Sequence, residues 1–153
     1  MNIVLDTNVL VAGLLSPFGP CGEIVRMVSS GEPALCFDAR ILSEYNDVLK
    51  RPKFHFEPDK VDVLLDFIVN RGKAVATCPL PEPLPDPDDE PFLAVAISGR
   101  VACLVTGNRA HFPARLRRGV SLLSPREFLI HYRRPPKRNP QTYGFPGCVE
   151  RIK

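Results

Sequence analysis

Apolar residues along the chain fall either in short continuous runs or in longer stretches with helical spacing. Residues 2–5, 34–37, 101–105 and 120–123 are such runs and predict buried strands, and residues 73–76 predict a weaker one. Between the runs, apolar side chains recur every three or four positions, which is typical of amphipathic helices. Strands that alternate with helices predict an α/β fold whose parallel sheet is covered on both faces.

Capping residues and prolines set the expected ends of the helices. Helices are expected at about residues 7–15, 21–30, 39–51, 58–71, 90–98 and 125–132. Asp6 or Thr7 can cap the first helix and Asp38 the third, which Pro52 ends. Residues 77–88 contain five prolines, so we expect an extended and stiff loop there.

Length and charge distribution predict one domain followed by a tail. The chain has 153 residues, enough for a single domain with a substantial core. Residues 1–132 carry 14 Lys and Arg against 16 Asp and Glu, whereas residues 133–153 carry six against one. We therefore expect a domain at 1–132 and a basic, proline-rich, disordered tail at 133–153, which either only solubilises the protein or contacts nucleic acid or a partner.

The cysteines and the N-terminus predict a cytoplasmic location. None of the five cysteines lies in a CxxC pair, so neither a zinc site nor a redox dithiol is expected, and their odd number favours a reducing compartment. The apolar N-terminal stretch lacks a preceding basic region and is interrupted by Asp6, unlike a signal peptide. No apolar run reaches the roughly 18 residues of a membrane span, so we expect no membrane association.

Polar and acidic residues follow the predicted strands at one edge of the sheet. Asp6 follows the first strand, Thr106 and Asn108 follow the strand at 101–105, and the acidic stretch 86–90 precedes the helix that leads to that strand. Glu44 lies beside the buried face of the helix after the second strand. Open α/β sheets bind ligands beyond the carboxyl ends of their strands, so these side chains are expected to meet.

Converging carboxylates predict a bound divalent cation. Two unit charges about 4 Å apart repel by roughly 4 kcal/mol at an effective dielectric constant of 20, so a carboxylate cluster needs protons or a cation. Ligands that are all oxygen favour Mg²⁺ or Mn²⁺. Such a metal can polarise a phosphoryl oxygen, activate water and stabilise a leaving oxygen, which predicts phosphodiester hydrolysis.

Each of these features also has a purely structural interpretation. Asp6 could be only a helix cap, and Glu44 could be a solvated residue at the flank of its helix. The acidic stretch 86–90 could simply complement a helix dipole, and residues 106–108 could form a plain turn. The basic residues Arg40, Lys50, Arg51, Lys53, Arg109 and Arg115 are candidates for binding an RNA backbone, although each alone is more typical of a soluble surface.

Four motifs, in this order, resemble the PIN domain. They are Ile-Val-Leu-Asp-Thr-Asn-Val-Leu at 3–10, Ser-Glu-Tyr with Val-Leu at 43–49, Asp-Pro-Asp-Asp-Glu-Pro-Phe-Leu-Ala-Val-Ala at 86–96, and Leu-Val-Thr-Gly-Asn at 104–108. The chain is similar in particular to the VapC-type toxins of bacterial toxin–antitoxin pairs. The resemblance covers about residues 1–130.

The resemblance implies a three-layer α/β/α sandwich with a five-stranded parallel sheet, and Mg²⁺- or Mn²⁺-dependent cleavage of single-stranded RNA. It assigns metal binding and catalysis to Asp6, Glu44 and a third acid. Residue type favours Asp89 as the third acid, helix phase favours Glu90, and Asp86 is a further candidate. Thr7, Asn8, Thr106 and Asn108 are expected to orient water or phosphate. A cognate antitoxin and a homodimer are the partners that the resemblance implies.

One departure from the family pattern leaves a second function open. Family members often carry a fourth acid where this chain has Asn108, so the fold could have lost turnover and could bind RNA or an antitoxin only. A haloacid-dehalogenase-like phosphatase is disfavoured, because position 8 holds Asn where that chemistry needs a second Asp. A receiver domain is disfavoured as well, because no suitable Asp ends a middle strand.

Overall fold

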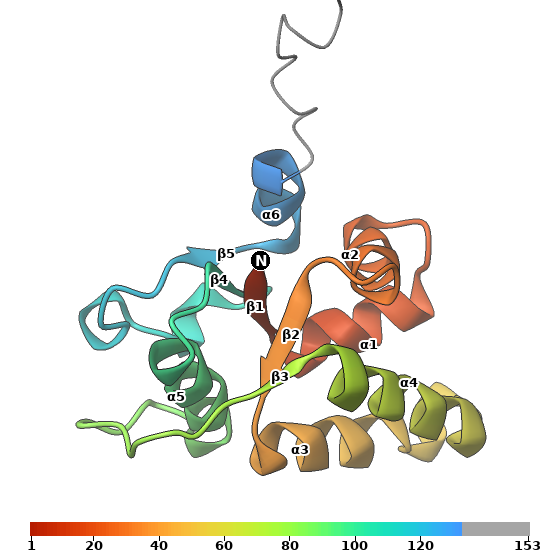
Figure 1. The fold of residues 1–153 in the computed structure, drawn as a ribbon, viewed down its shortest axis with the longest axis horizontal. Coiled ribbons are helices and arrows are strands. Elements are labelled where there is room, and N and C mark those ends of the chain that lie inside the picture. Colours follow the sequence, from red (N-terminus) through yellow and green to blue (C-terminus); the bar gives the residue numbers. More distant parts are fainter. Residues whose placement is uncertain (133–153) are drawn as a thin grey trace, which may run out of the picture.

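A five-stranded parallel sheet lies at the centre of the molecule (Figure 1). The structure, a computed structural model, describes residues 1–132. The strands are β1 (Asn2–Leu5), β2 (Ala34–Phe37), β3 (Lys73–Ala74), β4 (Cys103–Val105) and β5 (Leu122–Leu123), in the order β3-β2-β1-β4-β5. This sheet confirms the α/β fold that the alternation of strands and helices predicts.

Helices follow the strands at nearly the expected positions. They are α1 (Thr7–Leu15), α2 (Pro20–Ser29), α3 (Ala39–Leu49), α4 (Pro58–Arg71), α5 (Glu90–Ser98) and α6 (Pro125–Tyr132). Four short 3₁₀ helices lie in the connections: η1 (Pro52–Phe54), η2 (Pro87–Asp89), η3 (Arg109–His111) and η4 (Ala114–Leu116). The proline-rich segment is irregular as expected, except that η2 occupies its end.

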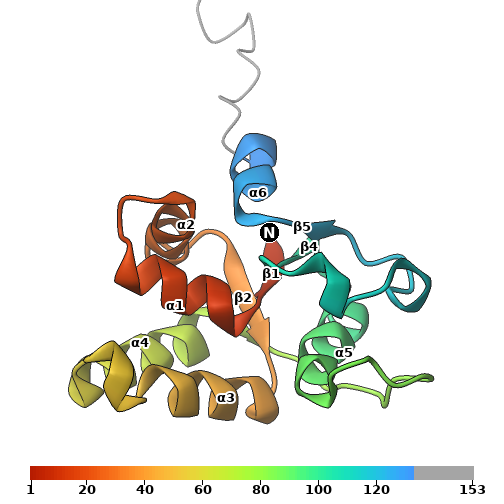
Figure 2. The ribbon, with the colours of Figure 1, turned by 180° about the vertical axis from the view of Figure 1, so that it is seen from behind.

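The helices form one layer on each side of the sheet. Helices α1 to α4 gather on one side, α5 packs against β1, β2 and β4 on the other, and α6 lies beside α2 and β5 (Figures 1 and 2). No single helix within residues 1–132 has the length and apolarity of a membrane span. Helices α1 and α2 reach them only as a pair bent by 100°.

The outer strands are shorter than their apolar patterns predict. Strand β3 ends at Ala74 rather than residue 76, and β5 is only two residues long. Both lie at the edges of the sheet and pair on one side only, so less of each segment is held in the ladder. The expected tail at 133–153 lies outside the described residues.

The central strands are fully buried and fix the positions of the residues that follow them. Ile3, Val4 and Leu5 of β1 have no solvent exposure, and neither do the residues of β4. Tyr45 of α3 is also wholly buried, and its hydroxyl donates a hydrogen bond to the carbonyl oxygen of Leu5. This bond ties the middle of α3 to the carboxyl end of the central strand.

Removing the Tyr45 hydroxyl is expected to destabilise the protein. Tyr45→Phe leaves the buried Leu5 carbonyl without its hydroxyl donor, which should lower the free energy of unfolding by about 1–2 kcal/mol in urea denaturation. Tyr132→Phe is the matched control, because no hydrogen bond of its hydroxyl is found within residues 1–132, and it should change stability by less than about 0.5 kcal/mol. Equal effects of the two substitutions would contradict this role for Tyr45.

Candidate functional site

The register of the two central strands brings Asp6 and Thr106 together. Leu5 of β1 pairs with Val105 of β4, so the next residue of each strand emerges at the same edge of the sheet. Thr106 Oγ1 donates a hydrogen bond of 2.7 Å to Asp6 Oδ2, and both residues are buried. Asp6 stands at the N-cap position of α1, but its side chain makes no capping hydrogen bond. Its carboxylate is held by Thr106 instead.

Helix α3 brings Glu44 to the same point. Asp38 caps this helix as expected, because its carboxylate accepts a hydrogen bond of 3.0 Å from the Ile41 amide. Glu44 follows on the side of α3 that faces α1, and Thr7 Oγ1 donates a hydrogen bond to Glu44 Oε2. The residue next to Asp6 therefore fixes the second carboxylate.

The acidic stretch before α5 supplies the third carboxylate from Asp89. This residue ends η2 and is 8% exposed. Its Oδ2 atom is buried and accepts no hydrogen bond, but it lies 3.0 Å from His111 Nδ1, with which it forms an ion pair when the histidine is protonated. A buried carboxylate oxygen without a hydrogen bond is costly, and such a group calls for an explanation such as a missing ion or water.

These carboxylates perturb one another's ionisation. Burial raises the pKa of Asp6, and the hydrogen bond from Thr106 offsets part of the rise. Burial also raises the pKa of Glu44, and the negative charges of Asp6 and Asp88 increase this rise, whereas the hydrogen bond from Thr7 and the charge of Arg51 oppose it. For Asp89, burial raises the pKa to about 6, His111 opposes this rise, and Asp6, Asp86 and Glu44 reinforce it. The three side chains thus share one negative field, as clustered acids do.

The structure places Asp89, rather than Glu90, in the electrostatic field of Asp6 and Glu44. Glu90 Oε2 accepts a hydrogen bond of 3.0 Å from the Leu84 amide, so this carboxylate is engaged with the proline-rich segment. Asp86 caps η2 by accepting a hydrogen bond from the backbone amide of Asp88. Its negative charge acts on the cluster by raising the pKa of Asp89. Helix phase does not apply to Asp89, because this residue ends η2 before α5 begins at Glu90.

The polar residues around the carboxylates differ in what they can do. Thr7 and Thr106 each donate to a carboxylate of the cluster. Asn8 is exposed on the first turn of α1, so its side chain is accessible to a ligand. The backbone amide of Asn108 donates a hydrogen bond of 3.1 Å to Thr106 Oγ1. The side-chain nitrogen of Asn108 lies 2.8 Å from His111 Nε2. Asn108 therefore links Asp6 to the histidine beside Asp89.

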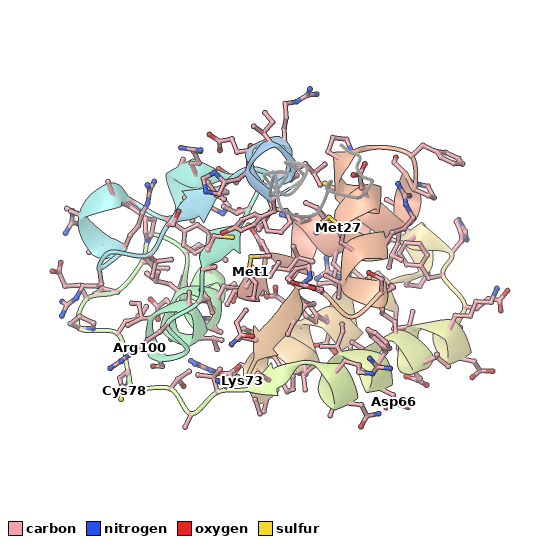
Figure 3. All side chains as sticks on the ribbon, turned by 45° about the horizontal axis from the view of Figure 1, so that its top comes forward. Met1, Met27, Asp66, Lys73, Cys78 and Arg100 are labelled. Carbon is pink, nitrogen blue, oxygen red and sulfur yellow. The ribbon has the colours of Figure 1, made fainter. Side chains whose placement is uncertain are left out.

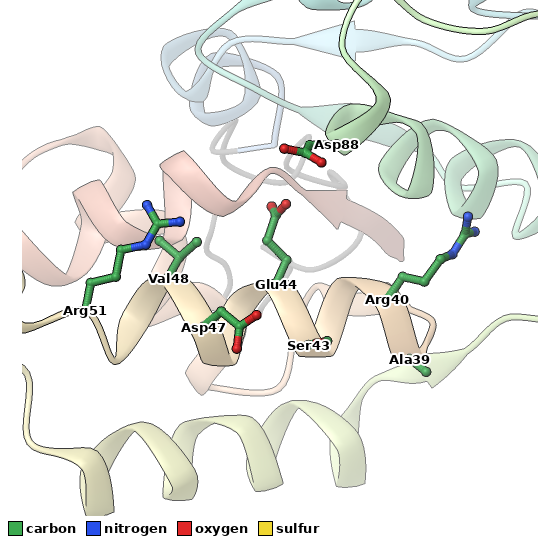
Figure 4. A pocket seen from close by; sticks show the side chains of 8 residues that line it. All are labelled: Ala39, Arg40, Ser43, Glu44, Asp47, Val48, Arg51 and Asp88. Carbon is green, nitrogen blue, oxygen red and sulfur yellow. The ribbon is translucent and has the colours of Figure 1, made fainter.

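Several of the basic candidates are neutralised by acids. Ion pairs join Arg40 to Asp38, Lys50 to Asp62, Arg109 to Glu127 and Arg115 to Glu82. Lys53 instead holds its ammonium 5.0 Å above the ring of Phe54. Arg51 lines a cleft with Glu44 and Asp88 (Figure 4).

Two further residues lie at the cluster that the motifs do not single out. His111 contacts Asp89 and Asn108, and Asp88 faces Glu44 across the cleft in Figure 4. The i, i+3 spacing of Asn108 and His111 across a tight turn was an available signal for the first. Asp88 lies within the acidic stretch, but sequence alone does not tell which of neighbouring acids faces a site.

The donor set fits a hydrated hard cation. Among residues 1–132, no three His, Cys, Asp or Glu side chains are placed so that together they could hold a metal ion. Mg²⁺ does not require this, because it usually keeps several waters and takes one or two carboxylates. The buried Asp89 Oδ2 and the neighbouring Asp6 and Glu44 offer only oxygen ligands, which favour Mg²⁺ or Mn²⁺ over zinc.

Replacing the Asp89 carboxylate by an uncharged amide is expected to stabilise the protein at neutral pH, when a chelator keeps divalent metals away. The folded protein binds the Asp89 proton more tightly than the unfolded chain does, so stability falls as pH rises from 3.8 to about 6. Asp89→Asn removes this loss and should raise the melting temperature by about 2–4 °C at pH 7.5, with a smaller gain at pH 5. The control Asp66→Asn alters an acid at the outer rim of α4 (Figure 3) and should leave the melting temperature unchanged. A lower melting temperature for Asp89→Asn at both pH values would contradict the electrostatic argument.

Comparison with known families identifies the fold. A family model of the PIN domain matches residues 2–110, which include the whole carboxylate cluster and the Thr106–Asn108 turn. A comparison with curated proteins finds no match. PIN domains have a nuclease-type fold, are generally hydrolases, and usually use divalent metals. From its parallel sheet, the placement of its motifs and this match, the chain belongs to the PIN domain family.

Proposed function

We propose that this protein is a metal-dependent endoribonuclease that cleaves single-stranded RNA. One observation carries the proposal. The polar residues that are buried in the described part of the chain are Asp6, Thr7, Asp89 and Thr106, and all four lie at the carboxyl edge of the sheet. A fold rarely retains buried carboxylates beside one another unless they have a use, because they reduce stability.

Asp6, Glu44 and Asp89 are the residues that would hold Mg²⁺ or Mn²⁺. When bound there, the metal would supply Lewis acidity toward a phosphoryl oxygen and would favour ionised water. The chain itself contributes the positioning of these ligands. Thr106 fixes the orientation of the Asp6 carboxylate, and Thr7 does the same for Glu44. Such supporting hydrogen bonds keep ligands in register with a substrate.

Other residues around the cluster would orient the substrate. Asn8 is exposed beside Asp6 and can donate to a phosphate oxygen. Asn108 and His111 brace the Asp89 side of the site through their mutual contact. In this proposal Asn108 replaces a fourth acid, which lowers the negative charge of the site by one.

The depth of the carboxylates supports a single-stranded substrate. Asp6 and Asp89 are less than a tenth exposed, and the cleft between α3 and Asp88 of η2 is the route by which we expect a scissile phosphate to approach them. A single strand can splay its backbone and bases into such a site, whereas a duplex presents a stiff cylinder.

Cleavage should depend on Asp6 and Asp89 but not on Glu90. With Mg²⁺ or Mn²⁺ and a labelled single-stranded RNA, we expect Asp6→Asn and Asp89→Asn to lower the cleavage rate by more than roughly 100-fold. Glu90→Gln is the matched control, because Gln can still accept the hydrogen bond from the Leu84 amide, and it should retain activity. Loss of activity in Glu90→Gln with retention in Asp89→Asn would contradict the assignment.

Metal binding gives a readout that does not depend on turnover. Mn²⁺ at ten times its dissociation constant should stabilise the wild type by about 1.4 kcal/mol and should stabilise Asp6→Asn far less. An equal shift in both proteins would show that the metal binds elsewhere. RNA binding without metal-dependent cleavage by the wild type would instead favour the second candidate function, a binding module, for which Asn108 at the fourth position is the supporting feature.

We further propose that the protein is the toxin of a toxin–antitoxin pair that acts in the cytoplasm. This part rests on the resemblance of its motifs to VapC-type toxins, which also suggests a cognate antitoxin and a homodimer as partners. A toxin of this kind harms the cell by cleaving RNA, so its effect requires the intact site.

Expression in a bacterial host tests the toxin proposal. Induction of the wild type should arrest growth, whereas Asp6→Asn expressed to the same level should not. Growth that is unaffected by a wild-type protein shown to cleave RNA in vitro would contradict the toxin role and leave the nuclease activity standing.

A further inference from the structure

A cleft runs along α3 beside the carboxylate cluster. Its volume is about 560 Å³, and Glu44 and Asp88 lie in its middle. Figure 4 shows Arg40 near the beginning of α3 and Arg51 just beyond its end, on either side of Glu44. A strand that reaches the carboxylates can therefore continue toward either arginine.

The two arginines differ in their electrostatic partners. Arg40 donates from Nε and Nη2 to one oxygen of Asp38, at 2.9 and 2.8 Å, so its charge is already offset. Within residues 1–132, Arg51 has no carboxylate at ion-pair distance, although its charge acts on Glu44 from further away and opposes the rise in the pKa of that residue. A phosphate could bind Arg51 without displacing an acid, whereas at Arg40 it would compete with Asp38.

Lys50 and Lys53, which lie close to Arg51 in the chain, also differ in whether an acid pairs with them. Lys50 pairs with Asp62 at 2.6 Å, whereas Lys53 rests its ammonium over the Phe54 ring and has no acid partner in the described part of the chain. The Phe54 and Phe56 rings stack with centroids 5.8 Å apart, and both pack against the core. The segment that carries Lys53 is thus anchored, and its free cation lies two residues beyond Arg51.

From this asymmetry we propose that the RNA strand leaves the carboxylate cluster toward the end of α3, where Arg51 binds one backbone phosphate and Lys53 binds another. The inference rests on the proposed nuclease function and adds the direction of the substrate path. The cluster repels phosphates, so we expect the strand to be held by nearby cations that no carboxylate engages in an ion pair. Arg51 can hold a phosphate through two parallel hydrogen bonds, which also fixes its position relative to the scissile bond.

The salt dependence of RNA binding tests the proposed path of the RNA strand under conditions in which no RNA is cleaved. The dissociation constant of a labelled single-stranded RNA is measured by fluorescence anisotropy in chelator, over a range of salt concentrations, for Arg51→Gln, Lys53→Gln, Arg40→Gln and Lys50→Gln. Each lost phosphate contact should reduce the slope of log affinity against log salt by about 0.7. We expect this reduction for Arg51→Gln and Lys53→Gln, together with weaker binding.

Lys50→Gln and Arg40→Gln are the matched controls, because each also removes one positive charge, but from a cation that is already paired with an acid. All four side chains are exposed, so the variants should fold, which a thermal melt verifies. The proposal is overturned if Arg51→Gln has the slope of Lys50→Gln, if Arg40→Gln loses more slope than Arg51→Gln, or if the wild type binds no RNA at low salt.

The outcomes separate this inference from the proposed function. A wild type that cleaves RNA, with an unchanged slope in Arg51→Gln, would overturn the path and leave the nuclease in place. If Arg51→Gln reduces the salt slope of RNA binding but the wild type cleaves no RNA with Mg²⁺ or Mn²⁺, the proposed path is supported and the nuclease function is contradicted.

Discussion

The parallel pairing of β1 with β4 is the constraint on which the rest of the site depends. Because Leu5 pairs with Val105, Asp6 and Thr106 emerge at the same level of the sheet edge and form a buried hydrogen bond. A shift of one residue in this register would send the side chains of one strand to opposite faces and separate the two. Every other part of the cluster is positioned relative to this pair.

Two helices complete the cluster by different means. Tyr45 fastens α3 to the end of β1, which leaves the adjacent Glu44 within reach of Thr7. On the other side of the sheet, the proline-rich segment tightens into η2 just before α5 and delivers Asp89 into the interior. Local devices of modest strength thus hold three mutually repelling acids together, and the fold bears the electrostatic cost at this one place.

Four of the basic residues considered for RNA binding are paired with acids, and this shapes what the site can bind. Arg40, Lys50, Arg109 and Arg115 all face acids, so their long-range fields are reduced. The acidic centre is therefore not surrounded by a uniform basic surface. Recognition of a polyanion at the site would depend on the cations beside the cluster that form no ion pair and on a neutralising metal, which makes both affinity and orientation sensitive to single side chains.

The sequence alone determined the element order, the parallel sheet and the candidate status of Asp6, Glu44 and the acids at 86–90, because hydrophobic periodicity and strand ends are local properties of the chain. It could not decide between Asp89 and Glu90, because that choice depends on a short 3₁₀ turn and on a hydrogen bond to Leu84. It also could not distinguish paired from unpaired cations, since ion pairs such as that of Lys50 with Asp62 join residues on different helices. Contacts between segments distant in the chain exist only after packing, and those contacts decided which residues of each motif face the site.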